Sequence, residues 1–152
     1  MRSDDTIALS GFARFLSFQD QGGTDTLDLS SSLLIGGIGG TLDMRPYPAL
    51  ENVVNCPVNV IGNDQANYIT VRGDVTSGAL IQGGGGNDTI VGNIGNDTLI
   101  GEEGKDKLIG NGGDDTFLAL DNKKDIIIGG EGFDTATLDK KDKRSEIESL
   151  LA

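Results

Sequence analysis

Histidine and tryptophan are absent from the 152-residue sequence, and cysteine occurs once, as Cys56. Without histidine the chain lacks the most common general base, the imidazole ligand of zinc sites, and any Ser/His or Cys/His pair for nucleophilic catalysis. A single cysteine also allows no internal disulfide. These absences exclude most hydrolase chemistry and most zinc chemistry, and we predict that the chain is not an enzyme.

Basic residues are scarce as well. The chain has 12 Lys and Arg against 24 Asp and Glu, so its formal net charge is −12 and its isoelectric point is about 4.2. A chain this acidic repels the phosphates of nucleic acids and of anionic membrane surfaces. No apolar run is long enough to span a membrane, and the first 18 residues lack the basic region and the continuous apolar stretch of a cleaved signal peptide. We expect no nucleic-acid partner and no membrane insertion.

Apolar residues make up only 36% of the chain and aromatic residues 5%, which is thin for a conventional core in a chain whose length suggests one domain. Glycine is abundant instead, with 24 residues, beside the 24 acidic side chains. Carboxylates and backbone carbonyls are the oxygen ligands of a hard cation such as calcium. The composition therefore favours a fold that is stabilised by more than apolar burial.

A nine-residue repeat occupies residues 83–137. Four copies follow one another without gaps, Ala119 is inserted after them, and two more copies follow, the first of them degraded. The copies span residues 83–91, 92–100, 101–109, 110–118, 120–128 and 129–137. Position six is always aspartate, as Asp88, Asp97, Asp106, Asp115, Asp125 and Asp134. Position eight is always apolar, as Ile90, Leu99, Leu108, Phe117, Ile127 and Ala136.

Each unit combines a Gly-rich turn with three residues that favour β-strands, and an apolar period of nine does not match a helix. We interpret the unit as a turn followed by a short strand. Two units would form one coil of a flattened parallel β-solenoid, in which position eight points inward and is buried by the stacking of coils. The predicted fold class is all-β, with a parallel β-roll over residues 83–137 that is preceded by irregular β-strands.

Copies that are two units apart lie on the same edge of such a solenoid. The predicted rows of aspartates are Asp88, Asp106 and Asp125 on one edge, and Asp97, Asp115 and Asp134 on the other. Like charges at the spacing of neighbouring strands repel each other unless a cation lies between them. Two carboxylates and several turn carbonyls supply the ligands that calcium requires, so we predict calcium ions between stacked turns and a block that folds when calcium binds.

The two flanks of the repeat are less regular. Residues 1–82 contain alternating apolar residues between Gly, Pro and Asn turns, and two eroded copies of the repeat at residues 62–70 and 74–82, the first with Asn67 in place of the aspartate. The tail, residues 138–152, is interpreted as a polar linker leading to a cap on the last coil, since the ends of a solenoid need covering. A short amphipathic helix is the alternative for the tail.

The copies resemble the GGxGxDxUx nonapeptide of the RTX (repeats-in-toxin) proteins, which forms a calcium-binding parallel β-roll. The resemblance implies that turn carbonyls and the aspartates hold calcium between stacked turns, and that the module is extracellular and folds after type I secretion. The implied ligands are Gly83, Gly84, Gly86, Asp88, Gly92, Gly95, Asp97, Gly101, Gly104, Asp106, Gly110, Gly113, Asp115, Asp125, Gly129, Gly130, Gly132 and Asp134. Asn93, Glu102 and Asn111 replace the second glycine of their turns.

The first half shows a second resemblance. The segments RSDDT at residues 2–6 and FQDQGGTDTLDLS at residues 18–30 are similar to the C-terminal domain of serralysin-type secreted metalloproteases. The resemblance implies one more calcium ion, held by Arg2, Asp4, Thr6, Asp20, Gly22, Gly23 and Asp25. The zinc motif of those proteases needs histidine, so a catalytic or toxin domain would lie outside this chain and be covalently linked to it.

These observations predict a calcium-binding module that folds on calcium and stabilises a neighbouring domain of a secreted bacterial protein, or assists its secretion. Two alternatives remain. The roll would recognise a polysaccharide, as in the RTX modules of alginate-modifying epimerases, or it would serve as a spacer or cap in a large bacterial adhesin. Polysaccharide binding predicts a basic or aromatic stripe on the surface, and a spacer predicts many copies in the parent protein.

Overall fold

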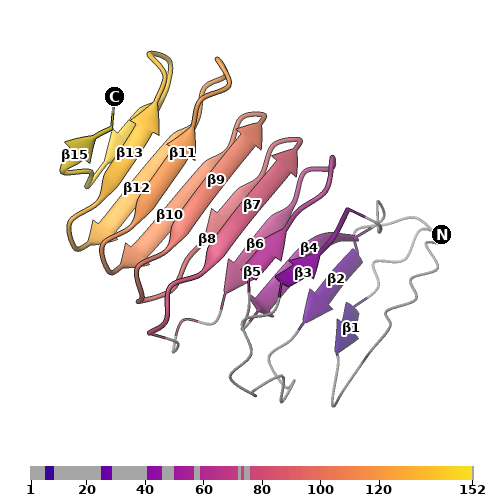
Figure 1. Cartoon of the computed structure of the whole chain (residues 1–152). Coiled ribbons are helices and arrows are strands. Elements are labelled where there is room, and N and C mark those ends of the chain that lie inside the picture. The colour runs from indigo at the N-terminus through magenta and orange to yellow at the C-terminus, as the bar shows by residue number, and fades with distance from the viewer. Residues whose placement is uncertain are drawn as a thin grey trace.

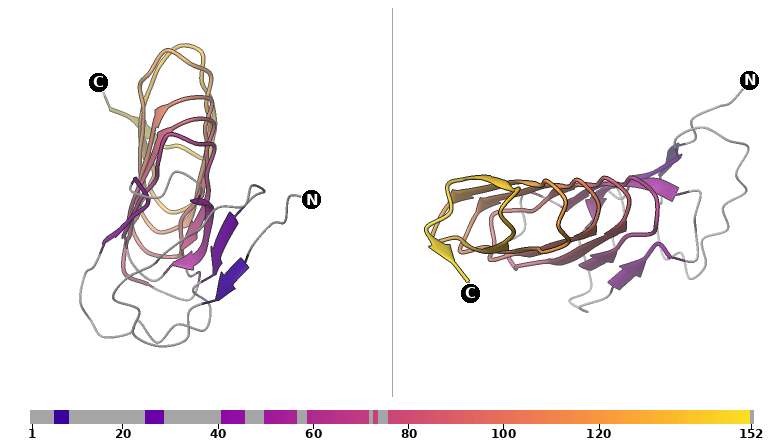
Figure 2. Two further views of the ribbon diagram at one scale, coloured as in Figure 1. Left: turned by 90° about the vertical axis from the view of Figure 1, so that its right-hand side faces the viewer. Right: turned by 90° about the horizontal axis from the view of Figure 1, so that it is seen from above.

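The computed structural model describes residues 6–8, 25–28, 41–45, 50–56, 59–71, 73 and 76–151. These residues form a flattened solenoid with two parallel β-sheets facing each other (Figure 1 and Figure 2). The described part of the chain contains no helix, so none of it could cross a membrane as a helix. The all-β parallel roll predicted from the nine-residue period is confirmed.

Every pair of neighbouring strands is parallel; the first two strands lie in one sheet, and from the second strand onward successive strands lie alternately in the two sheets. The eight-stranded sheet contains, in order, β1 (Thr6–Ala8), β2 (Asp25–Asp28), β4 (Leu50–Cys56), β6 (Tyr68–Val71), β8 (Thr89–Val91), β10 (Lys107–Gly112), β12 (Ile126–Glu131) and β14 (Lys143–Ser145). The seven-stranded sheet contains β3 (Thr41–Asp43), β5 (Asn59–Ile61), β7 (Leu80–Gly85), β9 (Thr98–Glu103), β11 (Thr116–Ala119), β13 (Thr135–Leu138) and β15 (Ser149–Leu150).

The core between the sheets is one layer of apolar side chains at position eight of the repeat. In the eight-stranded sheet Ile69 pairs with Ile90, and the stack continues through Leu108 to Ile127. In the other sheet the equivalent stack is Val60, Ile81, Leu99, Phe117 and Ala136. All of these side chains are fully buried. The inward direction predicted for position eight is therefore confirmed in all six copies, and also in the eroded copies that carry Ile69 and Ile81.

Strands on both flanks of the repeat join the same two sheets. Upstream, β2 pairs with β4 and β4 with β6, with a register shift in each pair. Downstream, β14 pairs with β12 and β15 with β13. The tail therefore forms two short strands rather than the helix that was the alternative for it, and these strands continue the stacking of the roll to residue 150.

Candidate calcium-binding edges

The turns between strands gather along two opposite edges of the solenoid. We call the edge formed by residues 62–67, 83–88, 101–106, 120–125 and 139–142 the first edge; it is the upper edge in Figure 1. The second edge is formed by residues 92–97, 110–115, 129–134 and 146–148. Each repeat turn ends on its position-six aspartate, which directly precedes a strand. The alternation of the chain between two sheets thus sorts the aspartates into two rows.

The first edge carries a continuous row of hydrogen bonds. The amide of Asp88 donates to Oδ1 of Asp106 at 2.8 Å, and the amide of Asp106 donates to Oδ1 of Asp125 at 2.8 Å. The row extends beyond the repeat at both ends. The amide of Asn67 donates to Asp88 at 2.8 Å, and the amide of Asp125 donates to Asp142 at 3.0 Å.

The second edge has the same construction. The amide of Asp97 donates to Oδ1 of Asp115 at 2.7 Å, and the amide of Asp115 donates to Oδ1 of Asp134 at 2.8 Å. Here the row begins at the amide of Ala79 and ends at the carboxylate of Glu148. Each predicted neighbour in the two rows is therefore in direct contact, and the inserted Ala119 lengthens the spacing to 19 residues without breaking either row.

The second carboxylate oxygen of most of these aspartates has no hydrogen-bond partner. Oδ2 is buried and unpartnered at Asp88, Asp106, Asp115, Asp125 and Asp134. These five residues are at most 2% exposed. Because a buried carboxylate oxygen without a partner is costly, this repeated pattern points to a ligand that the protein itself does not supply.

Burial raises the pKa of these carboxyl groups. The pKa rises from 3.8 to about 7 at Asp88 and Asp115 and to about 6 at Asp106 and Asp125. The pKa is also raised at Asp97 and Asp134. Loss of contact with water is the largest cause at every one of them, and repulsion from neighbouring carboxylates adds to it at all but Asp97, while the backbone hydrogen bonds of the rows oppose it. A cation beside the rows would remove both costs.

The first glycine of each turn makes room for its aspartate. A Cβ atom placed on Gly83, Gly92, Gly101, Gly110 or Gly129 would lie only 2.0 to 2.6 Å from Oδ2 of the aspartate five residues later. At Gly110 the same Cβ would also lie 2.7 Å from the carbonyl oxygen of Gly129, in the next coil. A carboxylate oxygen and a carbonyl oxygen therefore line one small space beside four of these glycines, all but Gly101, and no side chain larger than hydrogen fits there.

Positive φ angles recur at the second and fourth turn positions. Glycine takes this conformation at Gly84, Gly86, Gly104, Gly113, Gly130 and Gly132, whereas Gly95 does not. At the second position Glu102 and Asn111 also adopt it, with φ of 66° and 82°. Replacing glycine by Glu or Asn therefore preserves the turn, at the strain that a non-glycine residue pays in this region.

In two turns the side chain at position six has hydrogen-bond partners within its own turn. In the eroded turn Asn67 accepts a hydrogen bond from the amide of Asn63 at 3.0 Å and donates from Nδ2 to Oδ1 of Asn63 at 3.1 Å. In the turn of Asp97, the amide of Asn93 donates to Oδ2 at 2.6 Å. Oδ2 of Asp97 is therefore the exception among the six aspartates of the repeat.

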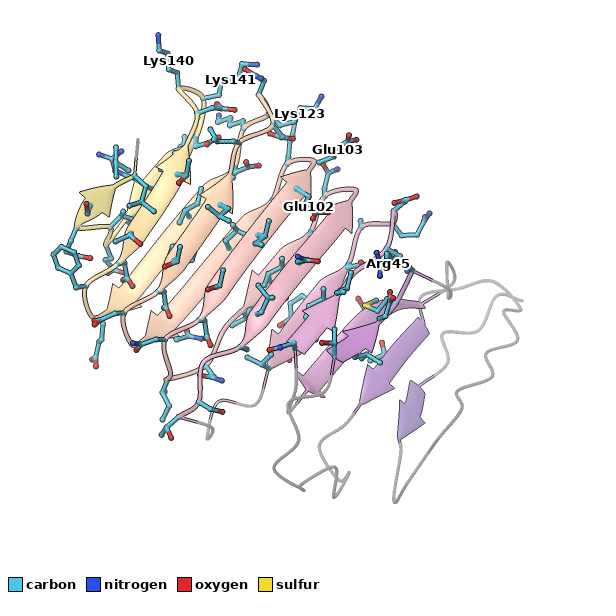
Figure 3. All side chains as sticks on the ribbon, viewed as in Figure 1. Arg45, Glu102, Glu103, Lys123, Lys140 and Lys141 are labelled. Atoms are coloured by element: carbon cyan, nitrogen blue, oxygen red, sulfur yellow. The ribbon has the colours of Figure 1, made fainter. Side chains whose placement is uncertain are left out.

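The degraded fifth copy keeps its aspartate but changes its turn. Asp121 accepts hydrogen bonds from the amides of Gly104 and Lys123, so its side chain braces a turn that has no glycine. Lysines gather on this part of the first edge, where Figure 3 shows Lys123, Lys140 and Lys141 near one another and Glu102 and Glu103 farther along the edge. The exposed rim of this edge thus carries both charges, whereas the buried row beneath it is acidic.

Asp142 and Glu148 belong to the rows but were not predicted. Each stands two residues before a position equivalent to position eight, as Arg144 and Leu150 pair with Ile127 and Ala136. The signal was the acid-x-apolar pattern of Glu148 and Leu150. The turns before them are shorter than those of the repeat, so a search for a period of nine does not find them.

The predicted site in the first half lies mostly outside the described residues. Arg2, Asp4, Asp20, Gly22 and Gly23 are not described. Thr6 is the first residue of β1 and Asp25 the first residue of β2. These two strands are paired, and Thr6 lies opposite Thr26. The topology therefore brings two of the seven predicted ligands close together, and the site itself stays a prediction.

The donor set of the two edges consists of oxygen alone. Among the residues described, no three His, Cys, Asp or Glu side chains gather into a group that could hold a metal ion. Carboxylates come in pairs of successive coils, so backbone carbonyls have to complete any coordination shell. Oxygen ligands from a flexible set of turns suit calcium, which accepts six to eight of them in variable geometry.

Comparison with known proteins agrees with this geometry. The family described as RTX calcium-binding nonapeptide repeat (4 copies) matches residues 82–117 and 121–137. These residues include all six position-six aspartates. No curated protein and no solved structure gives a significant match to the chain. Residues 82–117 and 121–137 therefore belong to the RTX calcium-binding nonapeptide repeats, which bind calcium ions and form a structural module rather than a catalytic fold.

Proposed function

We propose that this chain is a module whose roll folds when it binds calcium. The observation that carries the proposal is that five of the six position-six aspartates, on both edges, have a buried oxygen without a hydrogen-bond partner. A structure that buried these carboxylates with no cation would bear the desolvation cost and the mutual repulsion of both rows. The unfolded chain avoids both costs, so calcium has to supply part of the folding free energy.

The proposed ligands are the position-six aspartates and the carbonyls of the turn glycines. Each ion would lie between two stacked turns of one edge, where Oδ2 of an aspartate and a carbonyl from the next coil line the same space, as beside Gly110. The ion would neutralise the carboxylates and tie consecutive coils together. The glycines at positions one, two and four serve this arrangement through small size or positive φ.

A calcium-linked fold suits a protein that leaves the cell. RTX repeat proteins are typically secreted, and calcium modules that work outside cells bind in roughly the 10⁻⁴ to 10⁻³ M range. In a calcium-poor cytosol the rows would repel and the chain would stay unfolded, which favours passage through a type I system. Outside, calcium would fold the roll and stabilise a covalently linked catalytic or toxin domain. The serralysin-like segments of the first half support such a linkage.

Isothermal titration calorimetry of the chelator-treated chain tests the proposal. We expect several calcium ions per chain, heats larger than simple ion binding gives because folding accompanies binding, and no comparable response to magnesium, which requires a stricter octahedral geometry. A control is Glu103→Gln, which neutralises an exposed acid outside both rows. Absence of calcium binding, or equal responses to calcium and magnesium, would contradict the proposal.

A further inference from the structure

The last coil of the solenoid lies outside the residues that the family matches. Between β14 and β15 the chain needs only Glu146, Ile147 and Glu148 to turn the second edge, where the preceding coil uses residues 129–134. The pairing of Ile128 with Ser145 on one side, and of Thr135 with Ser149 on the other, places this short turn directly against the last complete repeat turn.

Glu146 takes the place of a first-position glycine. A Cβ on Gly129 would lie 1.8 Å from the carbonyl oxygen of Glu146 and 2.2 Å from Oδ2 of Asp134. In the preceding coil the equivalent carbonyl is that of Gly129, which lies 2.7 Å from a Cβ on Gly110. Glu146 has a positive φ, 56°, which the first-position glycines do not have, so the equivalence rests on its carbonyl oxygen. The same pair of oxygens therefore recurs here, although the sequence has no repeat.

Glu148 takes the place of a position-six aspartate. Its Oε2 accepts a hydrogen bond from the amide of Asp134 at 2.7 Å, just as Asp134 accepts one from the amide of Asp115 at 2.8 Å. The turn before Glu148 is three residues shorter than a repeat turn, and the extra methylene of glutamate lets its carboxylate reach the row. The second row thus ends on a carboxylate that only the tail provides.

Asp134 has an unsatisfied carboxylate oxygen in this arrangement. It is fully buried, and its Oδ2 has no hydrogen-bond partner. Its pKa is raised first by burial and then by the charges of Glu148, Asp114 and Glu146. A divalent cation would relieve both this repulsion and the cost of the buried, unpartnered oxygen, with backbone carbonyls completing its shell.

On the first edge of the same coil, protein groups satisfy some of the turn oxygens. Nζ of Lys141 donates a hydrogen bond to the carbonyl oxygen of Asn122, so a lysine ammonium group satisfies a turn carbonyl there. Both oxygens of Asp142 accept hydrogen bonds, from the amides of Asp125 and Asp139. Lys141 and Asp142 thus satisfy part of the first edge from within the tail, although Oδ2 of Asp139 is buried there without a partner; the second edge has no lysine contact of this kind among the described residues.

We propose that Oδ2 of Asp134, the carbonyl of Glu146 and the carboxylate of Glu148 bind one further calcium ion, which docks the tail onto the last repeat turn. This inference rests on the proposed function, since it adds a site to the same row. It assigns ligands to two residues that carry no repeat motif. It also makes the stability of the last coil depend on calcium.

The test compares the full chain with Glu148→Gln, which keeps the size of the side chain and removes its charge, and with the exposed control Glu103→Gln. Calcium bound at saturation is counted by equilibrium dialysis. Hydrogen exchange follows the amides of Ser149 and Leu151, which donate to the carbonyls of Asp134 and Ala136. We expect Glu148→Gln to bind one ion fewer, or to bind it on the order of tenfold more weakly, because calcium affinity follows ligand charge. Calcium should then no longer protect these two amides, while β10 stays protected.

Three outcomes decide the matter. Loss confined to the tail in Glu148→Gln, with Glu103→Gln like the parent chain, supports the inference. Unchanged ion number, affinity and amide protection in Glu148→Gln overturns it while leaving the proposed function intact, and a parent chain that binds no calcium overturns both. If Glu148→Gln does not fold, Glu148→Asp decides, because it keeps the charge with a shorter reach. Partial recovery of the fold and of the ion supports the site, and no recovery overturns it.

Discussion

Two stacked turns of the first edge differ in whether the buried side chain at position six has hydrogen-bond partners. The turn of residues 62–67 ends on Asn67, whose amide group is paired within the turn with Asn63. The turn of residues 83–88 ends on Asp88, whose Oδ2 is buried and has no partner. The apolar residues that follow, Ile69 and Ile90, are equally buried and pair with each other. The two coils therefore share their core residue and differ in their turns.

This difference separates what folds the chain from what calcium adds. A coil that ends on asparagine satisfies its buried groups with its own atoms and needs no ion. The coil that ends on Asp88 has the same core residue, but its turn contains two glycines with positive φ and its aspartate has a buried oxygen without a partner. An aspartate whose Oδ2 has no partner therefore makes its coil depend on a cation, whereas the side chains of Asn67 and Asp97 are satisfied within the protein.

Filling the space beside a first-position glycine should have the largest effect. In Gly110→Ala the new methyl group would meet Oδ2 of Asp115 at 2.0 Å and the carbonyl of Gly129 at 2.7 Å. We expect a loss of more than about 3 kcal/mol in the free energy of unfolding, together with loss of calcium binding at Asp115. Urea unfolding at saturating calcium and a calcium titration measure the two effects.

Gly112→Ala is the matched control, because its Cβ would have no neighbour closer than 3.8 Å. It should change the free energy of unfolding by no more than about 0.5 kcal/mol. If both alanine variants behaved alike, the small space beside Gly110 would have no special role.

Converting aspartate into asparagine should have a smaller effect that depends on the turn. Asp115→Asn removes the charge from an unpartnered oxygen, and we expect it to lower the stability of the calcium-loaded chain by about 2 to 3 kcal/mol. In Asp97→Asn the new amide can pair with Asn93 as Asn67 pairs with Asn63, so the loss should stay below about 1 kcal/mol. Urea unfolding in calcium measures both, and equal losses would contradict the comparison between the two kinds of turn.

A further expected effect is that of pH on the metal-free chain. The pKa in the folded state is raised from 3.8 to about 7 at Asp88 and Asp115, so the folded roll binds protons more tightly than the unfolded chain. The protonated folded state is favoured below about pH 4, and this stability is lost as the pH rises towards about 7. In chelator, the β-signal in circular dichroism should therefore be stronger at about pH 5 than at about pH 7.5.

The control for this prediction is the chain with calcium, which neutralises the rows without protons and should show a weaker gain on acidification. Sedimentation at both pH values checks that the signal comes from the monomer, since the chain loses net charge as it approaches its isoelectric point. A metal-free chain that loses β-structure between about pH 7.5 and pH 5 would show that the sign is wrong.

The sequence predicts the regular part of this fold well, for a local reason. Period nine, a Gly-rich turn and an apolar position eight leave few arrangements besides a two-sheet solenoid, so the burial of Leu99 and Leu108 follows from the pattern. The upstream strands were predicted only as irregular elements. Their pairing, such as that of Leu27 with Val53, joins residues far apart in a stretch without a period, with register shifts that no local pattern signals.

The candidate site was predicted in part for the same reason. The rows of aspartates follow from the stacking of units of fixed length. The ends of the rows do not, because Asp142 and Glu148 follow turns of different length, and only the strand pairing shows that they are in register. The satisfied state of Asp97 also escapes the pattern, since it depends on the backbone amide of Asn93, and Asn111 at the same position of the next copy on the second edge leaves Oδ2 of Asp115 without a partner.

Far-UV circular dichroism of the full chain at about pH 7.5, recorded in excess chelator and then during stepwise addition of calcium, tests the central claim most directly. The account predicts little β-structure in chelator, a steep gain as calcium is added, and full reversal on further chelation. A complete β-spectrum in chelator that calcium leaves unchanged would contradict it, because the buried rows would then be stable without a cation.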